Sequence, residues 1–124
     1  MASQSLNITT TQTTAGTVSG LFTLDNTNKQ TVIFDDTNVS SATTALTTSD
    51  VIYIATSVAK ETYVTIRNLD ATNYVVLSTG AGSAVVFGRV LPGESSTFCL
   101  APSVGLKLKG SVALNIEYAF FRKP

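Results

Sequence analysis

The acidic side chains that could hold a metal ion gather in one short stretch of the chain. Asp35 and Asp36 are adjacent, and Asp25 and Asn38 lie close to them in sequence. Hard cations such as calcium take several oxygen ligands, so a loop site is one interpretation. The stretch lacks the spacing of an EF-hand, however, and Asp and Asn are ordinary turn formers at hairpin ends. We favour the turn, and we expect no metal site and no required cofactor.

Residues for acid–base or nucleophilic catalysis are scarce. The 124 residues include no histidine and one cysteine, and the eight acidic residues are scattered. Such chemistry draws most often on His, paired carboxylates, Lys, Cys or a bound metal. Glycoside hydrolysis in particular needs two carboxylates flanking a cleft. We therefore expect no catalytic residues and no enzymatic activity.

Three further groups of residues have a structural interpretation beside a functional one. Cys99 lies in the apolar run Phe98–Leu100, so we expect a buried small hydrophobe rather than a reactive thiol; a single cysteine also fits a reducing cytosol. Gly80–Ser83 lacks the Lys-Ser/Thr of a phosphate loop, which favours a hairpin tip. A sugar-stacking face is one interpretation of the tyrosines, but the chain has no tryptophan, and aromatic residues in strands more often pack together. The tyrosines are Tyr53, Tyr63, Tyr74 and Tyr118.

The charge and the hydropathy of the chain argue against nucleic acid and membranes as partners. The formal net charge is zero, from eight basic and eight acidic residues, whereas nucleic-acid binders carry a clustered basic face. Lys107 and Lys109 alternate with leucines, so they mark the solvent side of a strand. The N-terminus has neither a cationic start nor an apolar run, so we expect no signal peptide. No run approaches the ~20 apolar residues that span a bilayer.

Short apolar runs separated by turn residues fill most of the chain. The clearest is Tyr63–Arg67, where Val64 and Ile66 alternate with outward-facing residues. Pro92-Gly93 fits the centre of a type II turn. About eight such runs, with no helical period, predict an all-β fold: a two-sheet β-sandwich of the jelly-roll or Ig-like kind. Nine apolar segments, from which about eight strands are expected, span residues 20–24, 31–34, 51–55, 63–67, 74–78, 84–91, 96–100, 106–109 and 112–121.

Local details follow from the same pattern. We expect Asp25–Asn28 to form the turn of a hairpin between the first two runs. Residues 39–50 are small and polar, which predicts a loop with at most a short strand near Ala45-Leu46. The expected core positions are Phe22, Ile33, Ile52, Ile54, Val64, Ile66, Val75, Leu77, Val86, Phe98, Leu100, Leu114 and Ile116.

The first 18 residues differ from the rest. They are rich in Thr, Ser and Gln, and their few hydrophobes cannot offset the entropy of ordering the segment by itself. We expect an extended N-terminal arm over residues 1–18, attached to a β-sandwich domain over residues 19–124. Such an arm can add a strand to a partner's sheet edge. The residues expected to bind a partner are Leu6, Ile8, Thr9, Thr10 and Thr11.

Segments of the C-terminal half resemble small structural proteins of tailed bacteriophages. The similarity covers about residues 62–120 and rests on four segments: Val64–Val75, Val90–Glu94, a strand that reaches Leu100-Ala101-Pro102, and Val112–Tyr118. In that group a turn of the form NLDxTNYV, a Pro-Gly-Glu turn and a terminal strand of the form VxLxxEY recur in this order. The resemblance implies a virion protein with a β-sandwich body, and a capsid decoration, or cement, protein in particular.

The expected function is therefore structural. We expect a homo-oligomer, with a trimer as the leading assembly, that binds the major capsid protein on the outside of the phage head. It would be synthesised in the host cytoplasm, with no nucleic-acid or membrane partner. Only 13% of residues are charged, about half the usual share, which suits packing between neighbours. The alternative is a receptor- or carbohydrate-binding tip of a phage tail or fibre.

Overall fold

The computed structural model describes residues 3–12, 26–35 and 39–124, and within these ranges it contains ten β-strands. No helix that could cross a membrane occurs in these ranges. The strands are β1 (Ser3–Gln12), β2 (Asn26–Asp35), β3 (Val39–Leu46), β4 (Val51–Ile54), β5 (Thr62–Asn68), β6 (Val75–Thr79), β7 (Val86–Val90), β8 (Ser95–Leu100), β9 (Leu106–Gly110) and β10 (Leu114–Arg122).

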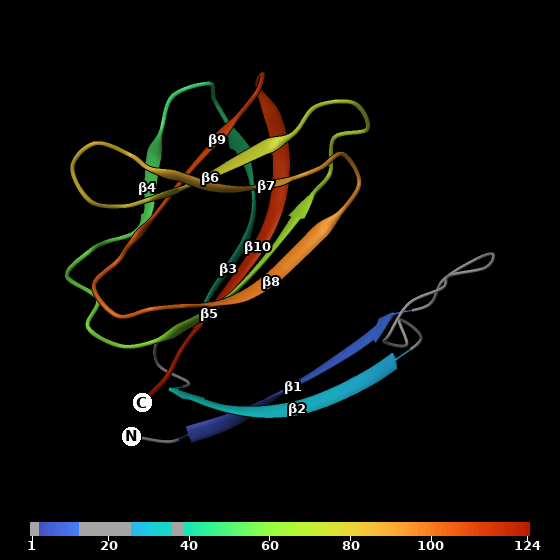
Figure 1. The fold of residues 1–124 in the computed structure, drawn as a ribbon, viewed down its shortest axis with the longest axis vertical. Coiled ribbons are helices and arrows are strands. Elements are labelled where there is room, and N and C mark those ends of the chain that lie inside the picture. Colours follow the sequence, from blue (N-terminus) through green and yellow to red (C-terminus); the bar gives the residue numbers. More distant parts are fainter. Residues whose placement is uncertain (1–2, 13–25, 36–38) are drawn as a thin grey trace, which may run out of the picture.

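The strands from β3 onward pair in a nested order. β3 pairs with β10, β4 with β9, β5 with β8, and β6 with β7, all antiparallel. Pairing of β10 with β5 and of β6 with β9 completes two four-stranded sheets. We call β3-β10-β5-β8 the β10 sheet and β4-β9-β6-β7 the β6 sheet. The two sheets stack as a sandwich (Figure 1), which confirms the all-β, two-sheet prediction.

Strict alternation along the strands builds the core. In β5, Val64 and Ile66 face the opposite sheet with no exposed surface, while Arg67 points outward. β9 contributes Leu106 and Leu108 in the same way. The buried hydrophobic cluster comprises Leu46, Ile54, Val64, Ile66, Val75, Leu77, Val90, Leu100, Leu106, Leu108, Leu114, Ile116 and Phe120.

The turn that follows β5 is held by the buried side chain of Asn68. Its Nδ2 donates to the carbonyl oxygens of Asn73 (2.7 Å) and Val90 (3.2 Å), and its Oδ1 accepts from the amide of Asp70 (2.9 Å). Because Asn68 belongs to the β10 sheet and Val90 to the β6 sheet, this one amide group links the two sheets. Asn68 is 1% exposed, so its three bonds are made out of contact with solvent.

The segments that carry the phage resemblance meet at the same corner. The amide of Asn68 donates to the carbonyl of Glu94, and the amide of Gly93 donates to the carbonyl of Asp70. The amide of Leu69 donates to the carbonyl of Asn115 in β10. Gly93 has a φ of 71°, and Glu94 donates back to Leu91, so the type II turn predicted at Pro92-Gly93 is confirmed.

Three of the predicted core residues are on the surface. Ile33 is 55% exposed because Val32 and Phe34, its neighbours in β2, occupy the buried face. Ile52 is 58% exposed because a register shift between Ile52 and Ile54 interrupts the alternation in the edge strand β4. The prediction was also wrong for Val86, which is 56% exposed on the edge strand β7. Phe98 is partly buried against the core, and Phe22 lies outside the described residues.

Two local predictions in the N-terminal third were also wrong. Asn26, Thr27 and Asn28 were expected in a turn, but they lie in β2, and β2 pairs with β1. Residues 39–50 were expected to form a loop, whereas β3 occupies Val39–Leu46 and pairs with β10 over eight residues. In both cases cross-strand pairing overrides a composition that is weakly strand-forming.

Candidate functional site

β1 and β2 form a two-stranded ribbon outside the sandwich, on the side of the β10 sheet (Figure 1). Ten residue pairs run from Ser3–Asp35 to Gln12–Asn26 without a register shift. Thr31 Oγ1 donates to Asn7 Oδ1 across the ribbon at 2.8 Å. The ribbon is therefore a regular antiparallel pair.

The two faces of the ribbon differ in burial. Leu6 and Ile8 of β1 are half-buried, and Val32 and Phe34 of β2 are 5% and 7% exposed. The opposite face is exposed at Ser5, Asn7, Thr9, Lys29, Thr31 and Ile33. The alternation has the period of two expected for a strand pair with one buried face.

The ribbon is anchored on the outer face of the β10 sheet. The rings of Phe34 and Phe121 pack edge-to-face, with centroids 5.1 Å apart. Phe121 lies beside Val39 of β3 and Tyr63 of β5 in the sheet register. Phe34 is the residue before the last in β2, so this contact holds one end of the ribbon.

All five residues predicted to bind a partner lie in β1. Leu6 and Ile8 are on the half-buried face, Thr9 is exposed, and Thr10 and Thr11 pair with Asn28 and Thr27 of β2. β1 is therefore already paired within the chain, with β2, and its addition to a partner's sheet stays a prediction. Each strand of the ribbon pairs on one side only in the described part of the chain.

The edge strands of the molecule differ in how they are protected. Native sheets blunt their edges with charges, prolines, bulges or very short strands. β4 has four residues and a register shift, and the pairing of β7 shifts between Leu77 and Ser78. β1, β3 and the six-residue β8 have none of these devices: they contain no charged residue, proline or glycine, and their registers are continuous.

β3 is exposed on both faces over most of its length. Every residue from Val39 to Thr43 is exposed, and Ala45 as well, so the β6 sheet covers only the end at Leu46. Sequence analysis missed this strand because a strand with two exposed faces has no apolar alternation. Its Val and Thr content was the available signal.

A shallow groove of about 500 Å³ lies on the outer face of the β10 sheet. Arg67 and Glu117 are directly opposite in the register and form one row of its floor. Thr65 and Ala119 form the next row, and Thr65 Oγ1 lies 3.1 Å from Thr97 Oγ1. The groove combines small side chains with one pair of opposite charges, a surface suited to hydrogen bonding.

A second cleft of about 510 Å³ opens between the edge strands β7 and β8. Phe87 and Phe98 pack edge-to-face at its mouth, 5.8 Å between centroids. Val85 and Val86 are exposed beside it. Cys99, which we expected to be buried, is exposed on β8, because Phe98 rather than Cys99 turns toward the core.

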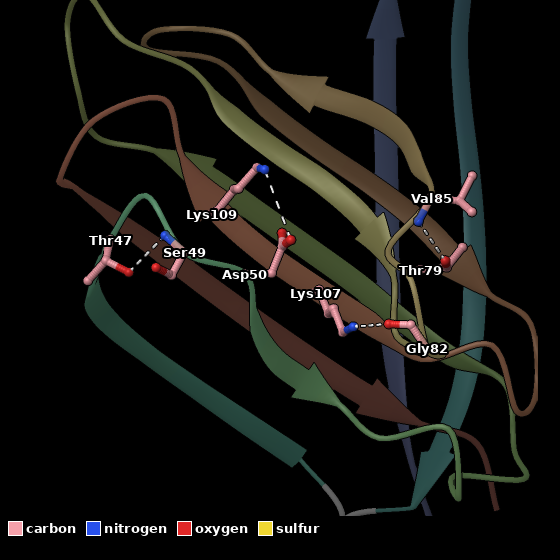
Figure 2. Close-up of polar contacts among 8 residues, drawn as sticks. All are labelled: Thr47, Ser49, Asp50, Thr79, Gly82, Val85, Lys107 and Lys109. Atoms are coloured by element: carbon pink, nitrogen blue, oxygen red, sulfur yellow. Dashed lines mark hydrogen bonds and ion pairs between the residues drawn. The ribbon is translucent and has the colours of Figure 1, made fainter.

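The two alternating lysines make local contacts. Lys107 Nζ donates to the carbonyl of Gly82 at 2.9 Å, and Lys109 Nζ lies 4.0 Å from Asp50 (Figure 2). Gly82 belongs to the tip between β6 and β7, as the hairpin interpretation of Gly80–Ser83 predicted. Both lysines therefore face other parts of the chain rather than forming an isolated basic patch.

The four tyrosines lie in different environments. Tyr53 and Tyr118 pack edge-to-face at 5.6 Å and contact the core. The Tyr74 ring lies under the Arg89 guanidinium at 4.3 Å, and Tyr63 faces outward from β5. They therefore do not build a common stacking platform.

The acidic stretch gives no assembled metal site in the described residues. Asp35 is buried in β2, while Asp25, Asp36 and Asn38 lie outside the described ranges. Residues 3–12, 26–35 and 39–124 contain no group of three His, Cys, Asp or Glu side chains placed to hold a metal ion. The carboxylate of Asp70, outside this stretch, accepts hydrogen bonds from the backbone amides of Thr72 and Asn73, and these bonds lower its pKa.

No family model, curated protein or solved structure matches the chain. The candidate site is therefore defined by geometry: the β1–β2 ribbon and the unprotected edges of β1 and β3.

Proposed function

We propose that this protein is a structural virion protein, a capsid decoration protein that binds and stabilises the head shell of a tailed phage. The observation that carries the proposal is the ribbon, a pair of strands with open edges, one of them the uncharged strand β1, outside a sandwich that buries its own core. A decoration protein needs such docking elements and no active site. Many weak contacts repeated by symmetry supply its affinity.

The strand pairing supports the same proposal. Nested pairing of β3 with β10, β4 with β9, β5 with β8 and β6 with β7 is the pattern of a long hairpin rolled up on itself. We infer a jelly roll from it, an architecture common in viral capsid proteins and lectins. A fold does not define a function, so this agreement supports the proposal only together with the ribbon.

The proposed partners are the major capsid protein and further copies of this chain, with a trimer at three-fold or quasi-three-fold positions of the head. The resemblance carried by Asn68–Val75 and Val112–Tyr118 supports the virion assignment. These segments are hydrogen-bonded together at one corner of the sandwich. The resemblance to phage proteins therefore concerns a unit of the fold and not a docking surface. We assign partner binding to the residues of β1 and not to these two segments.

Copy number in purified particles tests the proposal. We expect this chain at a number comparable to that of the major capsid protein, measured by quantitative mass spectrometry. Heads stripped of the protein should lose resistance to heat or osmotic shock and regain it when the purified chain is added back. Tens of copies per particle, or none, would refute a decoration role.

A second candidate, a carbohydrate-binding tip of a tail or fibre, is favoured by the groove on the β10 sheet. Jelly rolls include lectins, and Arg67, Glu117 and Thr65 offer donors and acceptors for sugar hydroxyls. Binding of the purified chain to a glycan array, abolished by Arg67→Ala and by Glu117→Gln, would favour this role. Glycan binding with few copies per particle would replace the first proposal.

A further inference from the structure

The two longest unprotected strand edges among the described residues, those of β1 and β3, do not pair with each other. The outer edge of β1 and the outer edge of β3 are both continuous and uncharged, and both lack proline and glycine. Each strand pairs on one side only among the described residues. Edges of this kind are templates for pairing with another chain.

Both edges belong to segments that the core of the sandwich covers only in part. A two-stranded ribbon is marginally stable in water unless another layer covers it. The ribbon is anchored near one end by Phe34 on Phe121. β3 is exposed on both faces from Val39 to Thr43 and pairs only with β10. Pairing with a further strand would stabilise both segments at once.

We propose that the free edge of β1 in one copy pairs with the free edge of β3 in a second copy, so that the ribbon extends the neighbour's β10 sheet. The strands match in length, with ten and eight residues, and in chemistry, because both are rich in Ser and Thr. Neither carries a charge, so no repulsion opposes their approach, and the net charge of the whole chain is zero.

This contact is heterologous, because donor and acceptor are different surfaces. Repetition of a heterologous contact closes into a ring when the rotation allows it. The donor strand is β1, which ends at Gln12, and the acceptor strand is β3, which begins at Val39. Each copy can therefore pair its β1 with one neighbour and its β3 with another. The inference rests on the self-association within the proposed function, but it does not depend on the virion role.

A charge-swap experiment tests the pairing in the full-length protein. One variant combines Ser5→Lys and Thr9→Lys in β1 with Ser41→Lys and Ala45→Lys in β3. Its matched partner carries the same β1 substitutions with Ser41→Glu and Ala45→Glu; both β3 positions lie opposite uncharged residues of β10, Ala119 and Asn115. All four positions are exposed, so the fold should be retained; circular dichroism and melting temperature check this.

The two variants have opposite expected behaviour in light scattering and sedimentation. Like charges placed across a strand pair are destabilising and opposite charges stabilising. The all-lysine variant should self-associate about tenfold more weakly than the unmodified chain, whereas the lysine–glutamate variant should regain association. That gain should vanish near 1 M salt, where the Debye length is about 3 Å.

Each alternative pairing gives a distinct result. If β1 pairs with β1, lysines in β1 weaken association whatever stands in β3. If β3 pairs with β3, the introduced glutamates repel one another and the second variant stays dissociated. Either result overturns the inference, as does an unmodified chain that is monomeric at about 100 μM. Should the all-lysine chain not fold, mixing a chain with only the β1 lysines and one with only the β3 glutamates must give a 1:1 complex.

Particle experiments separate this inference from the proposed function. Heads that carry this chain at full occupancy, combined with a failed charge swap, would leave the decoration role intact and remove the β1–β3 contact. A successful charge swap without binding to particles would support the β1–β3 contact and refute the decoration role.

Discussion

Residues 51–124 differ from the described segments before residue 47 in the burial and polarity of their strand residues. In the first region β5, β9 and the first half of β10 alternate between buried aliphatic residues and more exposed polar ones, and Val64, Ile66, Leu106 and Ile116 have no exposed surface. In the second, β1 and β3 carry small polar residues, and most of β3 is exposed. The first region stabilises the fold by burial, whereas the second offers backbone edges. Under the proposed function, the segments that stabilise the fold and those that bind a partner are separate parts of the chain.

The largest effect on stability should come from the core of the sandwich. Ile66→Ala removes a fully buried side chain from β5 and should cost about 2–5 kcal/mol of unfolding free energy. The matched control is Ile52→Ala, an isoleucine of β4 that is 58% exposed. Urea denaturation of both variants measures the difference. Equal losses would mean that the inward faces of β4 and β5 are assigned wrongly.

A smaller effect is expected at the corner that links the two sheets. Asn68→Ala leaves the carbonyls of Asn73 and Val90 and the amide of Asp70 without their partner. A buried polar group left unpaired costs about 1–3 kcal/mol. Asn115→Ala, whose side chain is exposed, is the control and should be close to neutral. Denaturation midpoints compare the two; a neutral Asn68→Ala would show that water satisfies these groups.

Sequence reasoning succeeded where burial imposes a pattern. The strand at Tyr63–Arg67 and the turn at Pro92-Gly93 were predicted because alternation and turn chemistry are local signals. It failed at Ile33, Ile52 and Val86, which are apolar residues of the ribbon or of edge strands. The hydropathy of a residue does not show whether its strand lies at the edge of a sheet, because the edge position depends on pairing between segments distant in sequence.

The candidate site could be predicted only in part for the same reason. The arm was expected from its composition, and the residues Leu6 to Thr11 do lie in one strand. Its pairing with β2, and the exposed strand β3, depend on contacts between distant segments. Without an apolar alternation, Val39–Leu46 resembles a loop. Regions that recognise partners through backbone edges carry little side-chain signal.

The carboxylate of Asp70 should make the corner turn sensitive to acid. Hydrogen bonds from the amides of Thr72 and Asn73 lower its pKa from the ordinary value of 3.8. Since the pKa is lower in the folded state, the stabilisation is present above the unfolded value and is lost as the pH falls through the folded value. The difference in melting temperature between the parent and Asp70→Asn should therefore be largest near pH 6 and shrink below pH 3.8. A difference that grows with acid would contradict this.

Deletion of residues 1–15 should have the smallest effect on the sandwich and the largest on docking. The deletion removes β1 entirely, while the core cluster contains no residue before Leu46. Thermal unfolding of the β-body should therefore shift little. β2 loses its only partner strand among the described residues, so Val32 and Phe34 should become more accessible, measurable by hydrogen exchange along β2.

The same truncation should strip the protein from the particle. Strand addition draws its affinity from main-chain hydrogen bonds, and the truncated chain lacks the β1 edge that we propose to pair with a neighbouring copy, so copies on the shell lose their contacts with one another. The triple substitution Lys29→Ala, Thr31→Ala and Ile33→Ala in β2 is the matched control: it removes exposed side chains from the same face of the ribbon but leaves β1 unchanged, and it should still bind heads. If the truncated chain decorates heads at full occupancy, the docking surface lies on the sandwich, and the groove formed around Arg67 and Glu117 becomes the next surface to mutate.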